Sequence, residues 1–174
     1  MILQRYTNPA DVSQQDVDNI SAARSTLDIA AYTITHGGII AAVAGRARAG
    51  VKVRLYLDRT ELESEARGDA TLAHCQLGVL LSTPNVQIKV KASSILMHLK
   101  SYCVDGKLLR DGSANFSPLG EGEQDNSMLV TDDSGALALW QCKFEAMWAR
   151  QDNLSVSQAI LESHRTVTAR DKSR

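Results

Sequence analysis

The chain has 174 residues, a formal net charge of −1, 44% hydrophobic residues and 22% charged residues. These values fit one globular domain and exclude a protein that coats nucleic acid through bulk positive charge. No apolar run approaches the roughly 18 residues that span a bilayer, and no signal segment opens the chain, so we expect a cytoplasmic protein without stable membrane insertion.

Strand and helix patterns alternate in the first third of the chain. Residues 11–24 carry apolar side chains at helical spacing, and the β-branched run 27–35 is typical of a buried strand. A helix is predicted over 38–49, and strict alternation predicts a strand over 51–58. A strand, a crossover helix and a second strand form a right-handed βαβ unit, so we expect these two strands to be parallel. The fold class is therefore α/β.

The later elements are less regular until the last helix. Residues 59–82 are predicted to contain a helix that ends near Gly78, and 86–91 alternate as a strand. A short strand is expected over 127–131 and a strong helix over 134–150. That helix carries an apolar stripe typical of a core-facing side, formed by Leu137, Trp140, Phe144, Met147 and Trp148. The polar residues after 150 allow at most a short peripheral helix.

A further strand is predicted over 95–104, and its period of two places His98 and Lys100 on the same face. Asp105 and Gly106 follow, and an Asp-Gly pair between two apolar runs is typical of a hairpin turn. We therefore expect Asp105 to turn the chain, while the histidine and the lysine form a paired functional face.

The returning arm of this hairpin leads to a second polar pair, Ser113 and Asn115, which alternation places side by side. A phosphodiester gathers negative charge on its non-bridging oxygens as the phosphorus becomes five-coordinate, and an ammonium and amide donors stabilise that charge. A histidine can attack phosphorus when neutral or protonate a leaving oxygen when cationic. One histidine cannot do both in one step, and a second copy of the chain is the economical source of the other.

The pattern His98-x-Lys100-x-x-x-x-Asp105, followed by Gly112-Ser113-x-Asn115, resembles the motif of the phospholipase D superfamily. The chain carries it once and is most similar to the small single-motif branch, which includes bacterial non-specific endonucleases. The resemblance covers roughly residues 20 to 150. It implies one phospholipase D-like domain over 1–150, with helices on both faces of a mixed β-sheet, and a polar tail over 151–174.

The resemblance also implies a homodimer with one active site on its two-fold axis, and neither a metal nor another cofactor. His98 of one subunit would form a covalent phosphohistidine, and the partner subunit's His98 would protonate the leaving oxygen. Lys100 and Asn115 of both subunits would grip the phosphate, with Ser113 alongside. Asp105 belongs to the motif, although its turn position suggests a structural contribution.

In the family a downstream Glu, followed by Asn, hydrogen-bonds the catalytic histidine and fixes its tautomer. The corresponding residue is Asp125, which is shorter by one methylene, so Glu121 or Glu123 could take this role instead. A carboxylate in that place would favour the cationic imidazole.

A nuclease that acts on DNA or RNA is the first hypothesis. Lys89 and Lys91 share a strand face and could track a polynucleotide backbone, although solvated lysines are an equal alternative. Hydrolysis of a phospholipid is the second hypothesis, and a module that binds phosphate or nucleic acid without turnover is the third. The remaining alternative is that His98 and Lys100 are an ordinary half-buried pair on a hairpin.

Overall fold

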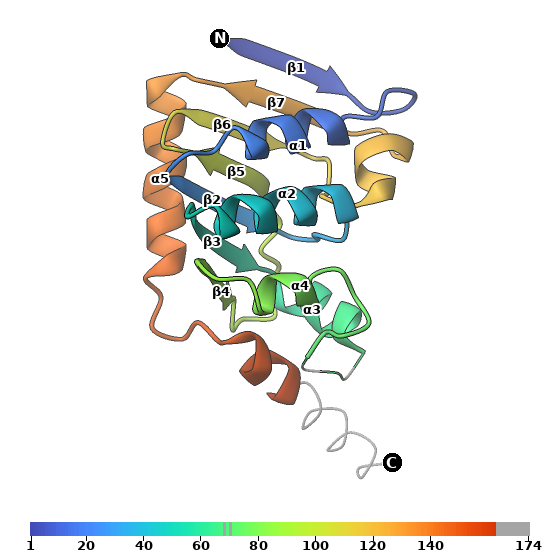
Figure 1. Cartoon of the computed structure of the whole chain (residues 1–174), viewed down its shortest axis with the longest axis vertical. Helices are drawn as coiled ribbons and strands as arrows, with labels where there is room; N and C mark the ends of the chain where they lie inside the picture. The colour runs from blue at the N-terminus through green and yellow to red at the C-terminus, as the bar shows by residue number, and fades with distance from the viewer. Residues whose placement is uncertain (68, 70, 163–174) are drawn as a thin grey trace.

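The structure is a computed structural model that describes residues 1–67, 69 and 71–162. These residues form one mixed sheet of seven strands in the order β1-β7-β6-β5-β2-β3-β4 (Figure 1). The strands are β1 (Ile2–Tyr6), β2 (Thr26–Ala31), β3 (Lys52–Leu57), β4 (Val86–Val90), β5 (Lys100–Val104), β6 (Leu108–Gly112) and β7 (Ser127–Thr131). β2, β3 and β4 are parallel, and the other neighbours are antiparallel.

Helices cover both faces of this sheet (Figure 1). They are α1 (Ser13–Ser21), α2 (Gly37–Arg48), α3 (Arg59–Ala66), α4 (Gly78–Leu81), the π-helical turn η1 (Leu119–Glu123) and α5 (Ser134–Trp148). On one face, Leu27 and Leu55 belong to the core formed with α1, α2 and α4, while Ala30 and Tyr56 pack with α5 on the other. The predicted α/β class, with helices on both faces of a mixed sheet, is confirmed.

The βαβ unit of β2, α2 and β3 has the predicted parallel strands. The register pairs Leu27 with Val53 and Ile29 with Leu55, and all four side chains are buried. The stripe predicted for α5 is also confirmed, since Trp140, Phe144 and Met147 are buried and Leu137 and Trp148 pack against them.

Two local predictions are wrong, and one strand has no counterpart among the predictions. Residues 59–82 contain two separate helices, α3 and α4, and the first ends at a left-handed Arg67. The strand predicted over 95–104 begins only at Lys100, because Lys91 and Asp58 hold the preceding loop through hydrogen bonds to its backbone. Strand β1 was not predicted at all.

The tail is not peripheral in its described part. Leu154 forms an isolated antiparallel bridge with Val90, and residues 156–162 are helical. Val156, Ala159 and Ile160 are buried in the larger core. The predicted short helix is thus present, but it closes the β4 edge of the main core. Residues 163–174 of the predicted tail lie outside the described part.

Within the described residues, no helix combines the length and the apolar character needed to cross a membrane.

Candidate active site

His98, Lys100 and the segment 113–115 lie near the carboxyl end of β2, where the chain continues as Tyr32 to Thr35. The Tyr32 amide donates to the Leu99 carbonyl over 2.8 Å, so this segment runs beside the His-x-Lys part of the motif. Ile34 forms a parallel bridge with Phe116, which directly follows Asn115. One short segment is therefore flanked by the His-x-Lys part of the motif on one side and by the residue after Asn115 on the other.

Lys100 is a buried cation, with only 4% of its surface exposed. Its Nζ donates to the His98 carbonyl over 2.8 Å and lies 4.4 Å from the centroid of the Tyr32 ring. Burial lowers the pKa of Lys100 to about 8, although the carboxylates of Asp58 and Glu61 act in the opposite direction. The Lys100 amine therefore titrates just above neutral pH, and a bound phosphate would favour its charged form.

His98 is exposed, in contrast to Lys100. Its ring meets the Tyr32 ring edge to face, with the centroids 4.6 Å apart. Among the described residues of one chain, no carboxylate hydrogen-bonds this imidazole, and Asp125 instead accepts a hydrogen bond from Asn8 over 3.2 Å. The orienting role of Asp125 stays a prediction, and Glu123 is exposed.

Ser113 and Asn115 differ in their surroundings. The Ser113 hydroxyl donates to the Asn126 side chain over 3.0 Å and accepts from the Ser127 amide over 3.0 Å, so it bonds to its own loop. Asn115 is half-buried, and its Oδ1 is buried without a hydrogen-bond partner. Gly120 of η1 packs directly against the Asn115 backbone. This amide oxygen within the motif is therefore an unsatisfied acceptor, open to a donor from outside the described residues.

A buried guanidinium, that of Arg110, connects the two halves of the motif through hydrogen bonds to their backbones. Arg110 Nη1 donates to the carbonyls of Lys100, over 2.7 Å, and of Ala114, over 3.1 Å. Its Nη2 pairs with Asp16 at 3.0 Å and Glu121 at 3.1 Å, and all three side chains are fully buried. Burial raises the pKa of Glu121 to about 8, with the Asp16 charge adding and Arg110 opposing. Glu121 is therefore part of the support under the site.

Asp105 lies in the β5–β6 turn with a positive φ of 54°, as predicted for a turn residue. Its carboxylate accepts hydrogen bonds of 2.8 to 2.9 Å from the backbone amides of Arg24, Ser25 and Thr26 and from the Ser25 hydroxyl. Partial burial acts to raise its pKa, but these bonds prevail and lower it to about 2. Asp105 thus ties the hairpin to the start of β2, at the sheet end opposite to His98.

The amines of Lys89 and Lys91 both bind protein carbonyls. Lys89 Nζ donates to the Trp148 carbonyl over 2.8 Å and lies 4.9 Å from the centroid of the Trp148 indole. Lys91 Nζ bonds to the carbonyls of Ile95 and Leu96, in the loop that carries His98. Their predicted contact with a polynucleotide therefore has no support from the position of these amines.

A hollow of about 490 Å³ adjoins the site. Its lining residues are Thr35, Glu65, Ala73, His74, Cys75, Gln76, Leu77 and Val79. Glu65 and Leu77 also line a narrow recess beside Tyr32 and Asp58, two residues that contact the motif segment. Burial, together with the Glu61 charge, raises the pKa of Glu65 to about 7.

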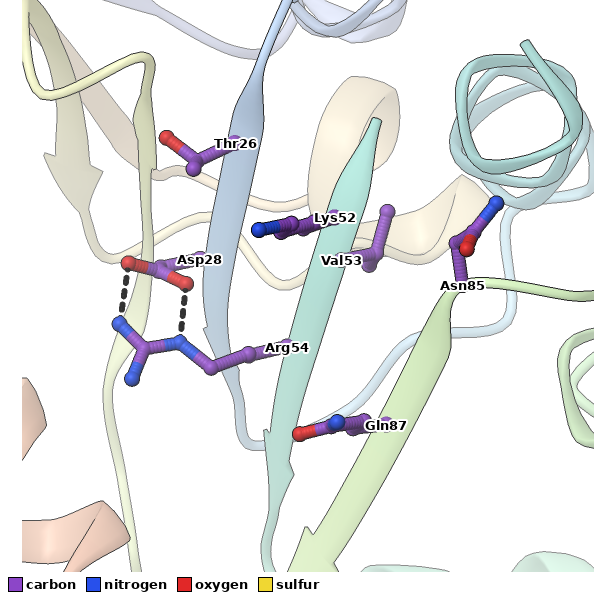
Figure 2. A pocket seen from close by; sticks show the side chains of 7 residues that line it. All are labelled: Thr26, Asp28, Lys52, Val53, Arg54, Asn85 and Gln87. Atoms are coloured by element: carbon purple, nitrogen blue, oxygen red, sulfur yellow. Dashed lines mark hydrogen bonds and ion pairs between the residues drawn. The ribbon is translucent and has the colours of Figure 1, made fainter. Parts of the chain in front are cut away.

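A second hollow, of about 420 Å³, lies at the amino ends of β2, β3 and β4 (Figure 2). There Arg54 forms a bidentate ion pair with Asp28, at 2.7 Å for both bonds, and also binds Glu145. The described residues that line this hollow include no histidine, cysteine or serine. It offers a polar surface without a histidine, and it lies at the sheet end away from His98.

Sequence reasoning missed three residues that contact or support the motif: Tyr32, Asp58 and Arg110. A local signal existed for Asp58, since Asp58-x-x-Glu61 after a strand is typical of a helix start. The Asp58 side chain does accept from the amides of Thr60 and Glu61, and it also accepts from the Met97 amide over 2.6 Å. Arg110 and Tyr32 gave no such signal, because their contacts are made between distant segments.

Comparison with known proteins places this arrangement in a family. The family model described as "cardiolipin synthase, PLD-like domain" matches residues 17–148. The chain belongs to this family. This PLD-like domain is 26% identical over 143 residues to a protein of Chlamydomonas reinhardtii named mitochondrial cardiolipin hydrolase. The match takes in 82% of the chain, which spans 60% of the length of that relative.

Two solved structures share the fold of the PLD-like domain. NucT from Helicobacter pylori has a TM-score of 0.70 and 22% identity, and the match covers 85% of this chain and 96% of NucT. Nuc from Salmonella typhimurium, described as a phospholipase D family member, has a TM-score of 0.71 and 15% identity, with coverages of 85% and 93%. The predicted resemblance to the phospholipase D superfamily is confirmed.

Proposed function

We propose that this PLD-like domain is a metal-independent phosphodiesterase that cleaves nucleic acid through a phosphohistidine, at a site that a second copy of the chain completes. One observation carries the proposal: a buried ammonium, Lys100, and an exposed imidazole, His98, contact the same aromatic ring. A buried cation without a carboxylate in hydrogen-bond contact is costly, and an anionic substrate would offset that cost. The imidazole then stands where it can reach the phosphorus of that substrate.

The proposed reaction has two displacements. In the first, His98 forms a bond to phosphorus, the bond to the leaving oxygen breaks, and the leaving oxygen takes a proton from the partner subunit's His98. In the second, water gives a proton to the partner subunit's His98 and attacks phosphorus, and the electron pair of the phosphorus–nitrogen bond returns to His98. Lys100 and Asn115 stabilise the charge on the non-bridging oxygens in both steps.

The hollow at the end of β2 offers room for more than the phosphate itself. Its lining combines polar side chains, among them Thr35, His74 and Gln76, with the apolar side chains of Leu77 and Val79. Nucleic acid is the first candidate substrate because polar groups beside a phosphate site can bind the sugars of a polynucleotide.

A specific observation keeps a phospholipid as the second candidate. Ile95 and Leu96, just before His98, are 76% and 46% exposed, and Leu119 of η1 is 53% exposed. Apolar side chains around an active site can enter a lipid surface or be covered by a second copy of the chain. The name of the Chlamydomonas relative, mitochondrial cardiolipin hydrolase, points to the same substrate class.

The function is tested by parallel assays on single-stranded DNA, double-stranded DNA, RNA and phospholipid vesicles, each with and without EDTA. We expect cleavage of nucleic acid that persists in EDTA and is lost in His98→Ala. His36→Asn is a matched control, because Asn can replace His36 as the cap of α2 and His36 lies outside the motif.

Complete loss of activity on chelation, or full activity of His98→Ala, would refute the mechanism. Cleavage of vesicles but not of nucleic acid would replace the first candidate by the second. Binding of DNA without turnover by the wild type would instead indicate a non-catalytic module.

A further inference from the structure

We propose that Tyr32, anchored by Glu61, is a positioning residue that holds His98 and Lys100 in the arrangement required for phosphate chemistry. The inference rests on the proposed phosphodiesterase function and adds a residue outside the motif to it. It follows from three independent contacts of Tyr32, one from its backbone, one from its ring and one from its hydroxyl.

The backbone of Tyr32 fixes its position beside β5. Its amide donates to the carbonyl of Leu99, the residue between His98 and Lys100. Tyr32 directly follows Ala31, which pairs with Lys100 in the β2–β5 register. The aromatic ring is therefore fixed beside both side chains by the sheet itself.

One ring then serves two side chains. The edge-to-face contact with His98 has an interplanar angle of 63°, and the Lys100 ammonium lies over the ring 4.4 Å from its centroid. The negative face of an aromatic ring attracts a cation, and its geometry restricts how a neighbouring imidazole can turn. Because His98 is exposed, this ring is its main restraint among the described residues.

The hydroxyl prevents the ring itself from moving. It donates to Glu61 Oε1 over 2.9 Å, while the Thr33 hydroxyl donates to Oε2 of the same carboxylate over 2.9 Å. The hydrogen bond to Glu61, with burial, raises the pKa of Tyr32 to about 12, so the hydroxyl remains a donor across the working pH range. Glu61 lies in the first turn of α3, whose cap Asp58 also holds the Met97 amide beside His98.

The pKa of Lys100 depends on the groups around it and can report on the contact with Tyr32. Asp58 and Glu61 face it from α3, and Tyr32 faces it from the end of β2. Arg110 approaches from β6 through the Lys100 carbonyl, and its guanidinium is paired with Asp16 and Glu121. Loss of the Tyr32 ring removes a group that favours the ammonium, and so should lower the pKa of Lys100 further.

The test compares Tyr32→Leu, Tyr32→Phe and Glu61→Gln with Tyr56→Phe. Tyr56 is a buried tyrosine that donates to Asn153 from the α5 side of the sheet, so its variant loses a hydroxyl contact outside the site. The readouts are the NMR titration of Lys100 in isotopically labelled protein and the pH profiles of kcat and KM on a small phosphodiester, bis(p-nitrophenyl) phosphate.

We expect Tyr32→Leu to lower the Lys100 titration by about one pH unit and kcat by about tenfold or more, with a smaller change in KM. Tyr32→Phe should lower the Lys100 titration by no more than about half as much as Tyr32→Leu does. It should still lower kcat, because the ring loses its hydrogen bond to Glu61. Glu61→Gln should shift the titration in the same direction as Tyr32→Leu. Tyr56→Phe should leave both readouts unchanged.

Wild-type titration and kcat in both Tyr32→Leu and Tyr32→Phe would overturn the positioning role. Should the leucine variant fail to fold, Tyr32→Phe and Glu61→Gln decide the question by the same two readouts. The two proposals remain distinguishable: a wild-type protein without phosphodiesterase activity contradicts the proposed function, while the NMR titration still tests the contact between Tyr32 and Lys100.

Discussion

At the scale of single residues, the Lys100 charge that is proposed to bind phosphate carries a cost for the stability of the fold. Its pKa of about 8 lies below the ordinary 10.5 because burial disfavours the ammonium. The unfolded chain therefore binds this proton more tightly than the folded chain does. The contribution of Lys100 to stability is unfavourable below pH 8 and becomes less so as the pH rises from about 8 towards 10.5.

Replacement by methionine should reveal this cost. Lys100→Met fills a similar volume without a charge, so we expect the free energy of unfolding at pH 7 to rise by about 2 kcal/mol while turnover is abolished. Urea denaturation at several pH values measures both the gain and its decrease between pH 8 and 10.5. A variant less stable than the wild type at pH 7 would show that the contacts with His98 and Tyr32 outweigh the burial of the charge.

Because Gly120 has no side chain, the backbone of Asn115 can lie directly against it. A Cβ at Gly120 would lie 2.4 Å from the Asn115 carbonyl oxygen and 2.8 Å from its amide nitrogen. We expect Gly120→Ala to displace Asn115 and to lower kcat/KM by about 100-fold, measured on a small phosphodiester. Gly45→Ala is the control, because nothing lies within 4 Å of a Cβ there. Its activity should equal that of the wild type, and its helix α2 should become more stable.

At the scale of elements, the β5–β6 hairpin depends on Asp105. Four hydrogen bonds stabilise its carboxylate, and its pKa of about 2 lies below the ordinary 3.8. This group therefore contributes stability that is present above about pH 4 and is lost as the pH falls towards 2.

We expect Asp105→Asn to lose about 2 kcal/mol of stability at pH 7, with a smaller effect on kcat of the folded fraction. Urea denaturation at pH 7 and at pH 2.5 checks this, since the difference from the wild type should shrink at the lower pH. An equal difference at both pH values would contradict the assigned role of the charged carboxylate.

The elements differ in how well sequence predicts them, for a physical reason. β2, β3 and α5 bury apolar side chains at regular spacing, and that spacing is visible in the sequence. β1 has no such pattern, because four of its five residues are exposed and only Leu3 is half-buried. It is a strand because it pairs with β7, more than 120 residues away in sequence. Pairing of this kind leaves no local periodicity.

The site shows the same division. The motif gave the positions of His98, Lys100 and Asn115 and the turn at Asp105, but not the burial of Lys100 or the role of Tyr32. Both depend on the way in which α3 and the end of β2 close over β5. A sequence pattern indicates which residue types a site contains, whereas the charge state of a buried amine depends on all the groups packed around it.

At the scale of the whole molecule, one chain presents an exposed histidine beside exposed apolar side chains, which suits a surface that a second copy covers. If both copies supply His98 to one site, an excess of His98→Ala should poison the wild type. After subunit exchange at nine variant chains to one wild-type chain, activity per wild-type chain should fall to about one-tenth. Unchanged activity per wild-type chain, with a monomer in light scattering, would show a complete site in each chain.

The residues proposed to bind the phosphate and the neighbouring hollow belong to different parts of the chain. Lys100 and Asn115 lie on or just beyond the β5–β6 hairpin, tied together by Arg110, whereas α3 and residues 73–79 build the hollow. Mutations in the second part can alter which molecules fit while the first part stays in place. In evolution, such a division lets a lineage change its substrates without losing its chemistry, and divergence among related chains over residues 59–81 is where such changes should be sought.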